Sequence, residues 1–452
     1  MISRIKTHLD LLLIDAERSW AFYLWVSMLI VLVVLAAHAL LMSLIYSLEI
    51  FEFSLKIPWG TMVSNYVFLV GSSVGLCIVL SLGLVFGSER YDLIVKRGLF
   101  MALITIIFGL ASIMLHLGHP ERPPIYSALT PNPRSAMWWM GMVYPPYILF
   151  LATCYWLLAR EELGKTASES VGLKAKIYRL LALEGLKAYV YRRLPLERLE
   201  AWIYRLLPLK RMGLALDSDG AHVRWARIIG ALTLVSGLLA YTVESTLFAH
   251  TEARPFWYGA LSPVDFFLGA CLCGFAWILS TEIITYKAKK EEIPERLKDL
   301  FYEMAEILAL LLSVEFLFIA YKMGHGLFEP AKAQIIMLFI TGPFSQAFWL
   351  FEIAIGIVLP IVILFYAARQ KKITAIPVAS VMVLIGYFVK RYDFVIAGQV
   401  YPVIKKDLPS YLPALVEVHV VGGILGALLL SYTLGEKFLP LKEGVNRPVQ
   451  DQ

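Results

Sequence analysis

Charged residues are scarce in this 452-residue chain, where Asp, Glu, Lys and Arg make up only 17%. An ordinary soluble domain carries about 25%, so the shortage argues against a conventional water-soluble protein. Hydrophobic residues make up 59% of the chain and recur in runs of roughly 20 residues, the length that spans a bilayer as a helix. We therefore expect an all-α, polytopic membrane protein with about ten transmembrane helices.

Cysteine and histidine are also rare. The four cysteines lie inside apolar runs and form no C-x-x-C pattern, so we expect no iron–sulfur cluster in this chain. Of the eight histidines only His38 and His419 lie well within apolar runs, which is weak support for a haem between two histidines. We expect no haem, no metal site, no catalytic residue in the usual sense and no nucleic-acid partner. The cysteines are Cys77, Cys154, Cys271 and Cys273.

The apolar runs divide the chain into four expected units. Residues 1–158 form a first four-helix bundle, 159–224 an amphipathic cytoplasmic insertion, 225–368 a second four-helix bundle, and 369–452 two C-terminal transmembrane helices with a tail. The ten expected spans are 20–47, 61–87, 98–117, 136–158, 225–249, 261–286, 301–323, 346–368, 372–391 and 412–436.

Lysine and arginine predict the orientation. Most of the 41 basic residues fall in the N-terminus, in alternate loops and in the C-terminal tail. Because cytoplasmic loops are enriched in Lys and Arg, we expect a multi-pass protein of the cytoplasmic membrane with both termini in the cytoplasm. The proline-rich stretch LHLGHPERPPIYSALTPNPRS, at 115–135, then lies at the outer face.

Two other features concern organisation. In the insertion, LERLEAWIYRLL at 196–207 places apolar side chains on one helical stripe, which predicts interfacial helices on the cytoplasmic leaflet. This surface is either a passive lid or a docking platform for a cytoplasmic subunit. AMW at 136–138 and AFW at 347–349 each follow a proline-containing outer loop, which suggests an internal repeat of two four-helix units.

Ionisable side chains inside spans are costly and are functional candidates by default. A row of carboxylates either relays protons or pairs with lysines to fix helix packing, and the residue types alone leave both open. The candidates for proton relay are Glu244, Glu315, Glu352, Glu417 and His419.

The outer stretch contains the best-defined candidate site. His116, His119, Glu121 and Arg122 are grouped where the third span ends, and an aromatic run including Trp138 and Tyr144 follows. Histidine exchanges protons near neutral pH, and arginine braces a carboxylate. This combination suits a quinone, which needs an apolar slot and groups that trade protons. An interfacial aromatic belt with a salt-bridged loop explains the same residues equally well.

Five sequence elements, taken in order, resemble the NrfD/PsrC/HybB family of quinone-linked membrane subunits. PWG at 58–60 with NYVF at 65–68 resembles the family's PWG…YVF opening, and HLGHPER at 116–122 resembles its LGRPER element. NPRSAMW at 132–138 and the FW..E pattern at 348–352 resemble later elements. TEARPFW at 251–257 is most similar to the DsrP branch, which includes the Hdr-like menaquinol oxidoreductases.

The resemblance implies a membrane subunit that binds menaquinone or menaquinol near the outer face and carries no redox cofactor of its own. It also implies a ferredoxin-like iron–sulfur subunit docked outside the membrane, with further membrane and cytoplasmic subunits similar to heterodisulfide reductase, and surrounding lipid. The expected quinone-binding residues are His38, Trp59, Asn65, His116, His119, Glu121, Arg122, Trp138 and Tyr144.

The chain departs from the family at three positions. Relatives often have Asp at the place of His116, and usually Arg at the place of His119. Relatives often have His near the place of Glu244, so the resemblance implies no proton path there. Two other functions stay open: an ion or proton transporter that uses the carboxylates, and a purely structural anchor.

Overall fold

The computed structural model describes residues 20–46, 51, 57–117, 119, 121–182, 221–400, 411 and 413–441. These residues form helices and connecting turns, with no strand among them. Nine helices of this part of the chain are long and apolar enough to cross a membrane. The expected all-α, polytopic membrane fold is therefore confirmed.

The bundle consists of long helices of at least 22 residues, except for one member that is two shorter helices joined end to end. They are α2 (Trp20–Tyr46), α3 (Thr61–Leu84), α4 (Val95–His116, preceded by the 3-10 turn η2, Tyr91–Ile94), α6 (Ala136–Glu169), α10 (Ala221–Ala249), α11 (Leu261–Ala288), α12 (Glu295–Gly326), the π-helix η3 (Ala347–Val358) continuing as α14 (Leu359–Arg369), α15 (Ile376–Val400) and α16 (Leu415–Phe438). Three shorter helices connect them: α5 (Arg122–Leu129), α7 (Leu173–Ala182) and α13 (Pro330–Ile340).

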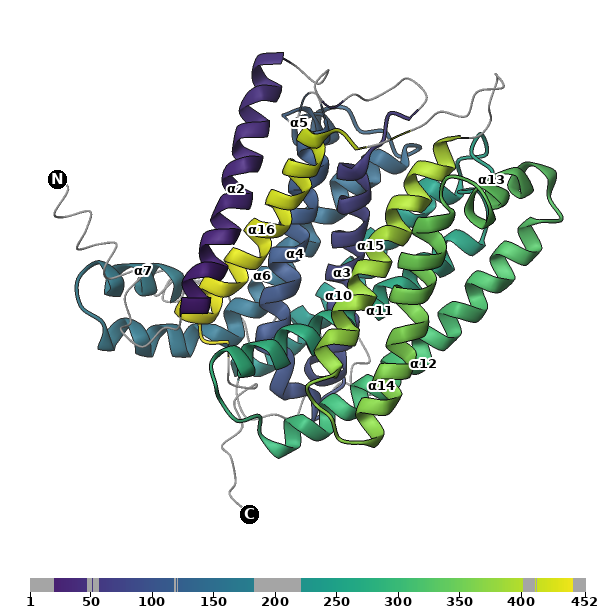
Figure 1. Cartoon of the computed structure of the whole chain (residues 1–452). Coiled ribbons are helices and arrows are strands. Elements are labelled where there is room, and N and C mark those ends of the chain that lie inside the picture. Colours follow the sequence, from purple (N-terminus) through teal and green to yellow (C-terminus); the bar gives the residue numbers. More distant parts are fainter. Residues whose placement is uncertain are drawn as a thin grey trace, which may run out of the picture.

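Helix α15 explains why nine helices pass as membrane spans where the sequence predicts ten. It is 25 residues long and lies among the other helices (Figure 1), but it carries Lys390, Arg391 and Asp393. All three side chains are buried inside the protein. Because Lys390 and Arg391 find carboxylate partners there, α15 tolerates charges that a lipid-facing helix of this composition would not.

The long helices pack into two adjoining rings. α3, α4, α6 and α10 pack pairwise around one ring, and α11, α12, η3–α14 and α15 around the other. α3 joins the rings by packing against α11 and α15, while α2 runs along α16 (Figure 1). This grouping differs from the consecutive one expected, because α2 lies outside the first ring and α10 lies inside it.

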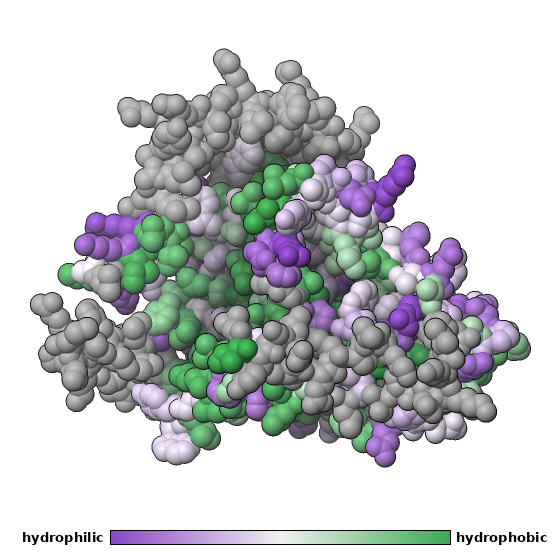
Figure 2. All heavy atoms as spheres, turned by 90° about the horizontal axis from the view of Figure 1, so that it is seen from above, coloured by the Kyte–Doolittle hydropathy of each residue, from purple (hydrophilic) through white to green (hydrophobic). Residues whose placement is uncertain are grey.

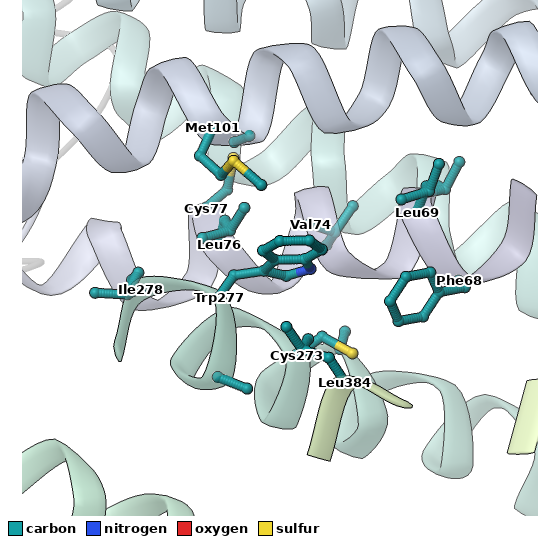
Figure 3. Packing of buried hydrophobic residues seen from close by; sticks show 14 of the residues in the cluster. Phe68, Leu69, Val74, Leu76, Cys77, Met101, Cys273, Trp277, Ile278 and Leu384 are labelled. Carbon is teal, nitrogen blue, oxygen red and sulfur yellow. The ribbon is translucent and has the colours of Figure 1, made fainter. Parts of the chain in front are cut away.

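The junction between the rings is a close helix contact. A Cβ atom on Gly75 of α3 would lie 1.7 Å from the carbonyl oxygen of Ala270 in α11, so only glycine fits there. Small residues of this kind let helix backbones approach closely within a membrane. Beside this contact, Trp277 of α11 packs toward Val74 and Cys77 of α3 (Figure 3).

The two ends of the bundle differ. α5 and α13 lie at one end and α7 at the other (Figure 1), and Figure 2 looks onto the α5 end, where hydrophilic and hydrophobic side chains are interleaved. The indole N–H of Trp138 donates to the carbonyl oxygen of Ser127 at 2.7 Å, and that of Trp349 donates to Ile340 at 3.1 Å. Each tryptophan thus links a long helix to the short helix before it by a hydrogen bond. The similarity between AMW and AFW therefore includes this helix–helix contact. The stripe predicted at 196–207 lies outside the described residues.

Candidate functional site

The first ring holds a buried chain of three polar side chains, which we call the Tyr–Glu cluster. The hydroxyls of Tyr66 (α3) and Tyr144 (α6) are 2.5 Å apart, and the Tyr144 hydroxyl donates to Oε2 of Glu244 (α10) at 3.1 Å. Their exposed fractions are 3%, 5% and 0%. Two phenols and a carboxyl in series can hold a proton and pass it along. The cluster lies one to two turns inside the α5 end, since Tyr66 follows the start of α3 by five residues and Glu244 precedes the end of α10 by five.

Two buried oxygens of the first ring lack a hydrogen-bond donor, one in the Tyr–Glu cluster and one on Asn65, the residue before Tyr66. Nδ2 of Asn65 donates to Oγ of Ser112 at 3.2 Å, and Ser112 donates to the carbonyl oxygen of Met62 at 2.8 Å. Oδ1 of Asn65 and Oε1 of Glu244 have no hydrogen-bond partner among the described residues. A buried acceptor without a donor costs about 1–3 kcal/mol. A ligand that donates hydroxyl hydrogens to these two oxygens would remove that cost.

The rim of the site is formed by the end of α4, α5 and the start of α6. Ser135 caps α6 by accepting the backbone N–H of Trp138 at 3.4 Å. His116, the last residue of α4, is half-buried, whereas His119, Glu121 and Arg122 are exposed. Nδ1 of His119 lies 3.1 Å from Oε1 of Glu121, and Nε of Arg122 lies 4.0 Å from the same oxygen.

Glu121 contributes an ionised carboxylate to the exposed rim. The pKa of Glu121 lies below its usual range, first because of backbone hydrogen bonding and then because of His119 and Arg122. This carboxylate therefore stays ionised at neutral pH between two basic neighbours. The expected grouping of His119, Glu121 and Arg122 is present in space, but these three side chains face water.

Trp59 belongs to a separate aromatic group at the same end. Its ring stacks on Trp257 at 5.3 Å, and the side chain of Gln399 bonds both to the N–H and to the carbonyl oxygen of Trp59, at 2.9 and 2.8 Å. Arg254 donates to the carbonyl oxygen of Gln399 at 2.5 Å. The PWG and TEARPFW elements, far apart in sequence, thus meet at Gln399.

Three further predicted residues lie apart from the Tyr–Glu cluster. His38 is exposed on α2, whose main contacts are with α16. Glu417 accepts the backbone N–H of Met62 at 3.1 Å and the hydroxyl of Tyr411, so it satisfies an N–H in the first turn of α3. His419 lies half-buried two residues farther along α16, which turns it to a different face of the helix from Glu417.

Glu315 and Glu352 lie in the second ring, in a group that we call the ionic cluster. Nζ of Lys390 contacts Oδ1 of Asp265 at 2.6 Å and also pairs with Glu315. Nη1 of Arg391 contacts Oδ2 of Asp265 at 2.9 Å. Glu352 is buried nearby and interacts electrostatically with Lys390. The carboxylates therefore form separate groups on different helices, and two of the predicted relay residues accompany a buried lysine.

Several side chains that organise these groups carry no distinguishing signal in the sequence. Tyr66 stands out there only as part of the NYVF element, and it meets Tyr144 and Glu244 from positions 78 and 178 residues away. Ser112 and Arg391 do not stand out either, because a serine in an apolar run and an arginine near a span end are common. Within the described ranges, no group of three His, Cys, Asp or Glu side chains is placed to hold a metal ion.

Comparison with known proteins agrees with the resemblance drawn from the motifs. The family model described as "Polysulphide reductase, NrfD" matches residues 48–403. Among curated relatives, a selenate reductase subunit of Mesobacillus selenatarsenatis is 23% identical over 394 residues, which is 85% of this chain and 86% of the relative. The Hdr-like menaquinol oxidoreductase integral membrane subunit of Archaeoglobus fulgidus is 22% identical over 405 residues, 85% of each chain. A putative dimethyl sulfoxide reductase membrane subunit of Halobacterium salinarum is 23% identical over 443 residues, 92% of this chain and 91% of the relative.

These relatives include the Hdr-like branch that TEARPFW predicts, and each name describes one subunit of an oxidoreductase. The match begins at residue 48, before the PWG element, ends at residue 403, just after α15, and covers both rings. The chain is a multi-pass membrane protein that belongs to the NrfD polysulphide reductase family.

Proposed function

We propose that this chain is the quinol-binding membrane subunit of an oxidoreductase complex, and that menaquinol binds at the Tyr–Glu cluster near the outer face. The observation that carries the proposal is the buried Tyr66–Tyr144–Glu244 cluster, together with the unpartnered buried oxygens of Glu244 and of Asn65, the residue before Tyr66. Quinol hydroxyls are hydrogen-bond donors, which both oxygens lack. The named menaquinol oxidoreductase relative supports the choice of quinone.

A bound quinol supplies two electrons and two protons on oxidation. Oε1 of Glu244 accepts one hydroxyl hydrogen and Oδ1 of Asn65 orients the other hydroxyl. Tyr144 holds Glu244 in place by donating its hydroxyl hydrogen to Oε2, and the Tyr66 hydroxyl is hydrogen-bonded to that of Tyr144. Trp138 and His116 are half-buried at the rim. His116 accepts the proton of the second hydroxyl and releases it to water, and the proton taken up by Glu244 leaves by the same exit.

The electrons leave to a partner protein, because we expect no redox cofactor in this chain. The rim of His119, Glu121 and Arg122 is exposed and charged, which suits the edge of a docking surface for an iron–sulfur protein outside the membrane. The basic character of the α7 end, with Lys174, Lys176 and Arg179 on α7, supports a cytoplasmic location for that end and for both termini.

The remaining predicted residues take other roles in this proposal. Glu417 and Trp59 hold the start of α3 and the residues before it in position. His38 lies on α2, and we assign it to the lipid-side approach of the quinone tail rather than to the cluster. Glu315 and Glu352 belong to the ionic cluster of the second ring.

The test is to purify the native complex and to measure both its quinone content and quinol-dependent reduction of its partner clusters. Glu244→Gln should lower the rate by about tenfold or more, because a removed acceptor costs about 1–3 kcal/mol. Glu417→Gln is a matched control on another buried carboxyl. Extraction that yields no quinone, together with an unchanged rate in Glu244→Gln, would overturn the proposal and favour a structural anchor.

A further inference from the structure

Helix α7 has two apolar faces, and only one of them packs against the protein. Ala175, Tyr178 and Ala182, spaced three and four residues apart, lie on the buried face, where α7 packs on α6, and each is at most 7% exposed. Ile177 and Leu180 lie on the opposite face and are 48% and 72% exposed. An exposed apolar face of this kind marks a contact with lipid or with a partner.

Two hydrogen bonds hold α7 at the level where the membrane spans end. The Tyr178 hydroxyl donates to the carbonyl oxygen of Phe438, the last residue of α16, at 2.8 Å. The indole N–H of Trp156, in the long helix α6, donates to the carbonyl oxygen of Leu181 at 3.2 Å. In Figure 1, α7 lies level with the start of α2, another membrane span. The exposed apolar face of α7 therefore meets the edge of the hydrocarbon layer, as the apolar face of an interfacial helix does.

Helix α7 carries three cations beside this face and no acidic residue. Lys174, Lys176 and Arg179 are all exposed, and none of them pairs with an acidic side chain of the described residues. Lys176 and Arg179 are three residues apart, so they are neighbours on one flank of the apolar face. Like charges at this spacing repel each other. An anion held by both side chains would remove that repulsion.

We propose that this side of α7 binds an anionic phospholipid, with the phosphate held by Lys176 and Arg179 and the acyl chains lying on the apolar face. Leu180 is four residues after Lys176, so the apolar and cationic stripes touch along the helix. The stems of lysine and arginine run along apolar surface while their charged ends reach the headgroups. This lipid site is independent of quinol binding at the Tyr–Glu cluster.

A phospholipid matches this surface more completely than an acidic protein does. The acidic surface of a cytoplasmic protein would match the cations but not the apolar face. A phospholipid presents a negative phosphate at the membrane surface and acyl chains directly below it, which is the arrangement of the two stripes on α7. Anionic lipid attracts each lysine or arginine near the surface, and burial of Ile177 and Leu180 adds to that attraction.

The first test is titration of the purified full chain with phosphatidylglycerol or with phosphatidylcholine of the same acyl chains, followed by native mass spectrometry. Lys176→Gln and Arg179→Gln should each weaken phosphatidylglycerol binding by about fivefold, and the double variant by about 25-fold, with phosphatidylcholine binding unchanged. Lys372→Gln is the matched control, because it removes an exposed cation in the turn between α14 and α15. The same phosphatidylglycerol affinity in the wild type and the double variant would overturn the site.

The second test locates the apolar face by spin labelling, in lipid nanodiscs and in the native complex. A label on Leu180→Cys should be reached by oxygen dissolved in the bilayer, and a label on Lys372→Cys by a water-soluble nickel chelate. The wild type, treated in the same way, gives the background from the native cysteines. Access of the nickel chelate to the Leu180→Cys label would overturn the lipid contact. A label that neither reagent reaches in the native complex would also overturn it and would show a protein partner on α7.

Discussion

Gly75→Ala should destabilise the protein strongly, because it forces a methyl group into the junction between the two rings. The new Cβ atom would lie 1.7 Å from the carbonyl oxygen of Ala270 and 2.5 Å from its carbonyl carbon. Both are backbone atoms, so no side chain can rotate away and the helices must separate. Overpacking a tight core costs about 1–3 kcal/mol, and we expect about 3 kcal/mol here, roughly a 150-fold loss in the folded-to-unfolded ratio.

The assay is unfolding of the purified chain in mixed micelles with increasing denaturing detergent, followed by circular dichroism. Gly422→Ala is the control, since its Cβ atom would meet only Leu32 Cδ2, at an ordinary 3.9 Å. The control should equal or exceed the wild type, because alanine favours a helix over glycine by up to about 1 kcal/mol. Equal unfolding midpoints for Gly75→Ala and the wild type would refute the close α3–α11 contact.

Two other results follow from the buried charges and the ends of the bundle. Lys390→Met should cost about 3–5 kcal/mol of stability, because it leaves Glu315 without the cation that it contacts. The control is Lys298→Met, on an exposed ion pair, which should change stability by less than about 1 kcal/mol. Equal losses of stability in the two variants would contradict the account. A membrane-impermeant thiol reagent added to intact cells should label Tyr126→Cys on α5 and leave Lys174→Cys on α7 unlabelled until the membrane is opened; the reverse pattern would invert the proposed orientation.

The spans could be predicted from the sequence because hydropathy alone determines which segments can cross a bilayer. The apolar run at 372–391 was predicted as a span and corresponds to α15, although Lys390 and Arg391 at its end lower the mean hydropathy of this helix. Those charges are stabilised by Asp265, on a helix more than a hundred residues earlier. Their acceptability is a property of the packed structure and not of the segment.

The candidate site was predictable in parts and not as an assembly. The NYVF motif marked Asn65, the aromatic run after the outer stretch marked Tyr144, and the cost of a buried charge marked Glu244. The contact between Tyr144 and Glu244 joins residues 100 positions apart. It depends on how α6 and α10 are rotated about their axes. Helices that are apolar on all sides, such as α3, carry no periodic pattern that sets this rotation, so the role of Tyr66 could not be predicted.

The most direct measurement of the central claim is the affinity of the purified chain, in lipid nanodiscs, for a menaquinol analogue. Tyr144→Phe should raise the dissociation constant by about fivefold and Glu244→Gln by about fivefold to a hundredfold, as expected for about 1 kcal/mol and about 1–3 kcal/mol of lost hydrogen bonding. Tyr147→Phe, whose hydroxyl bonds elsewhere on α3, should bind as the wild type does. Equal affinities in all four proteins would contradict a quinol site at the Tyr–Glu cluster.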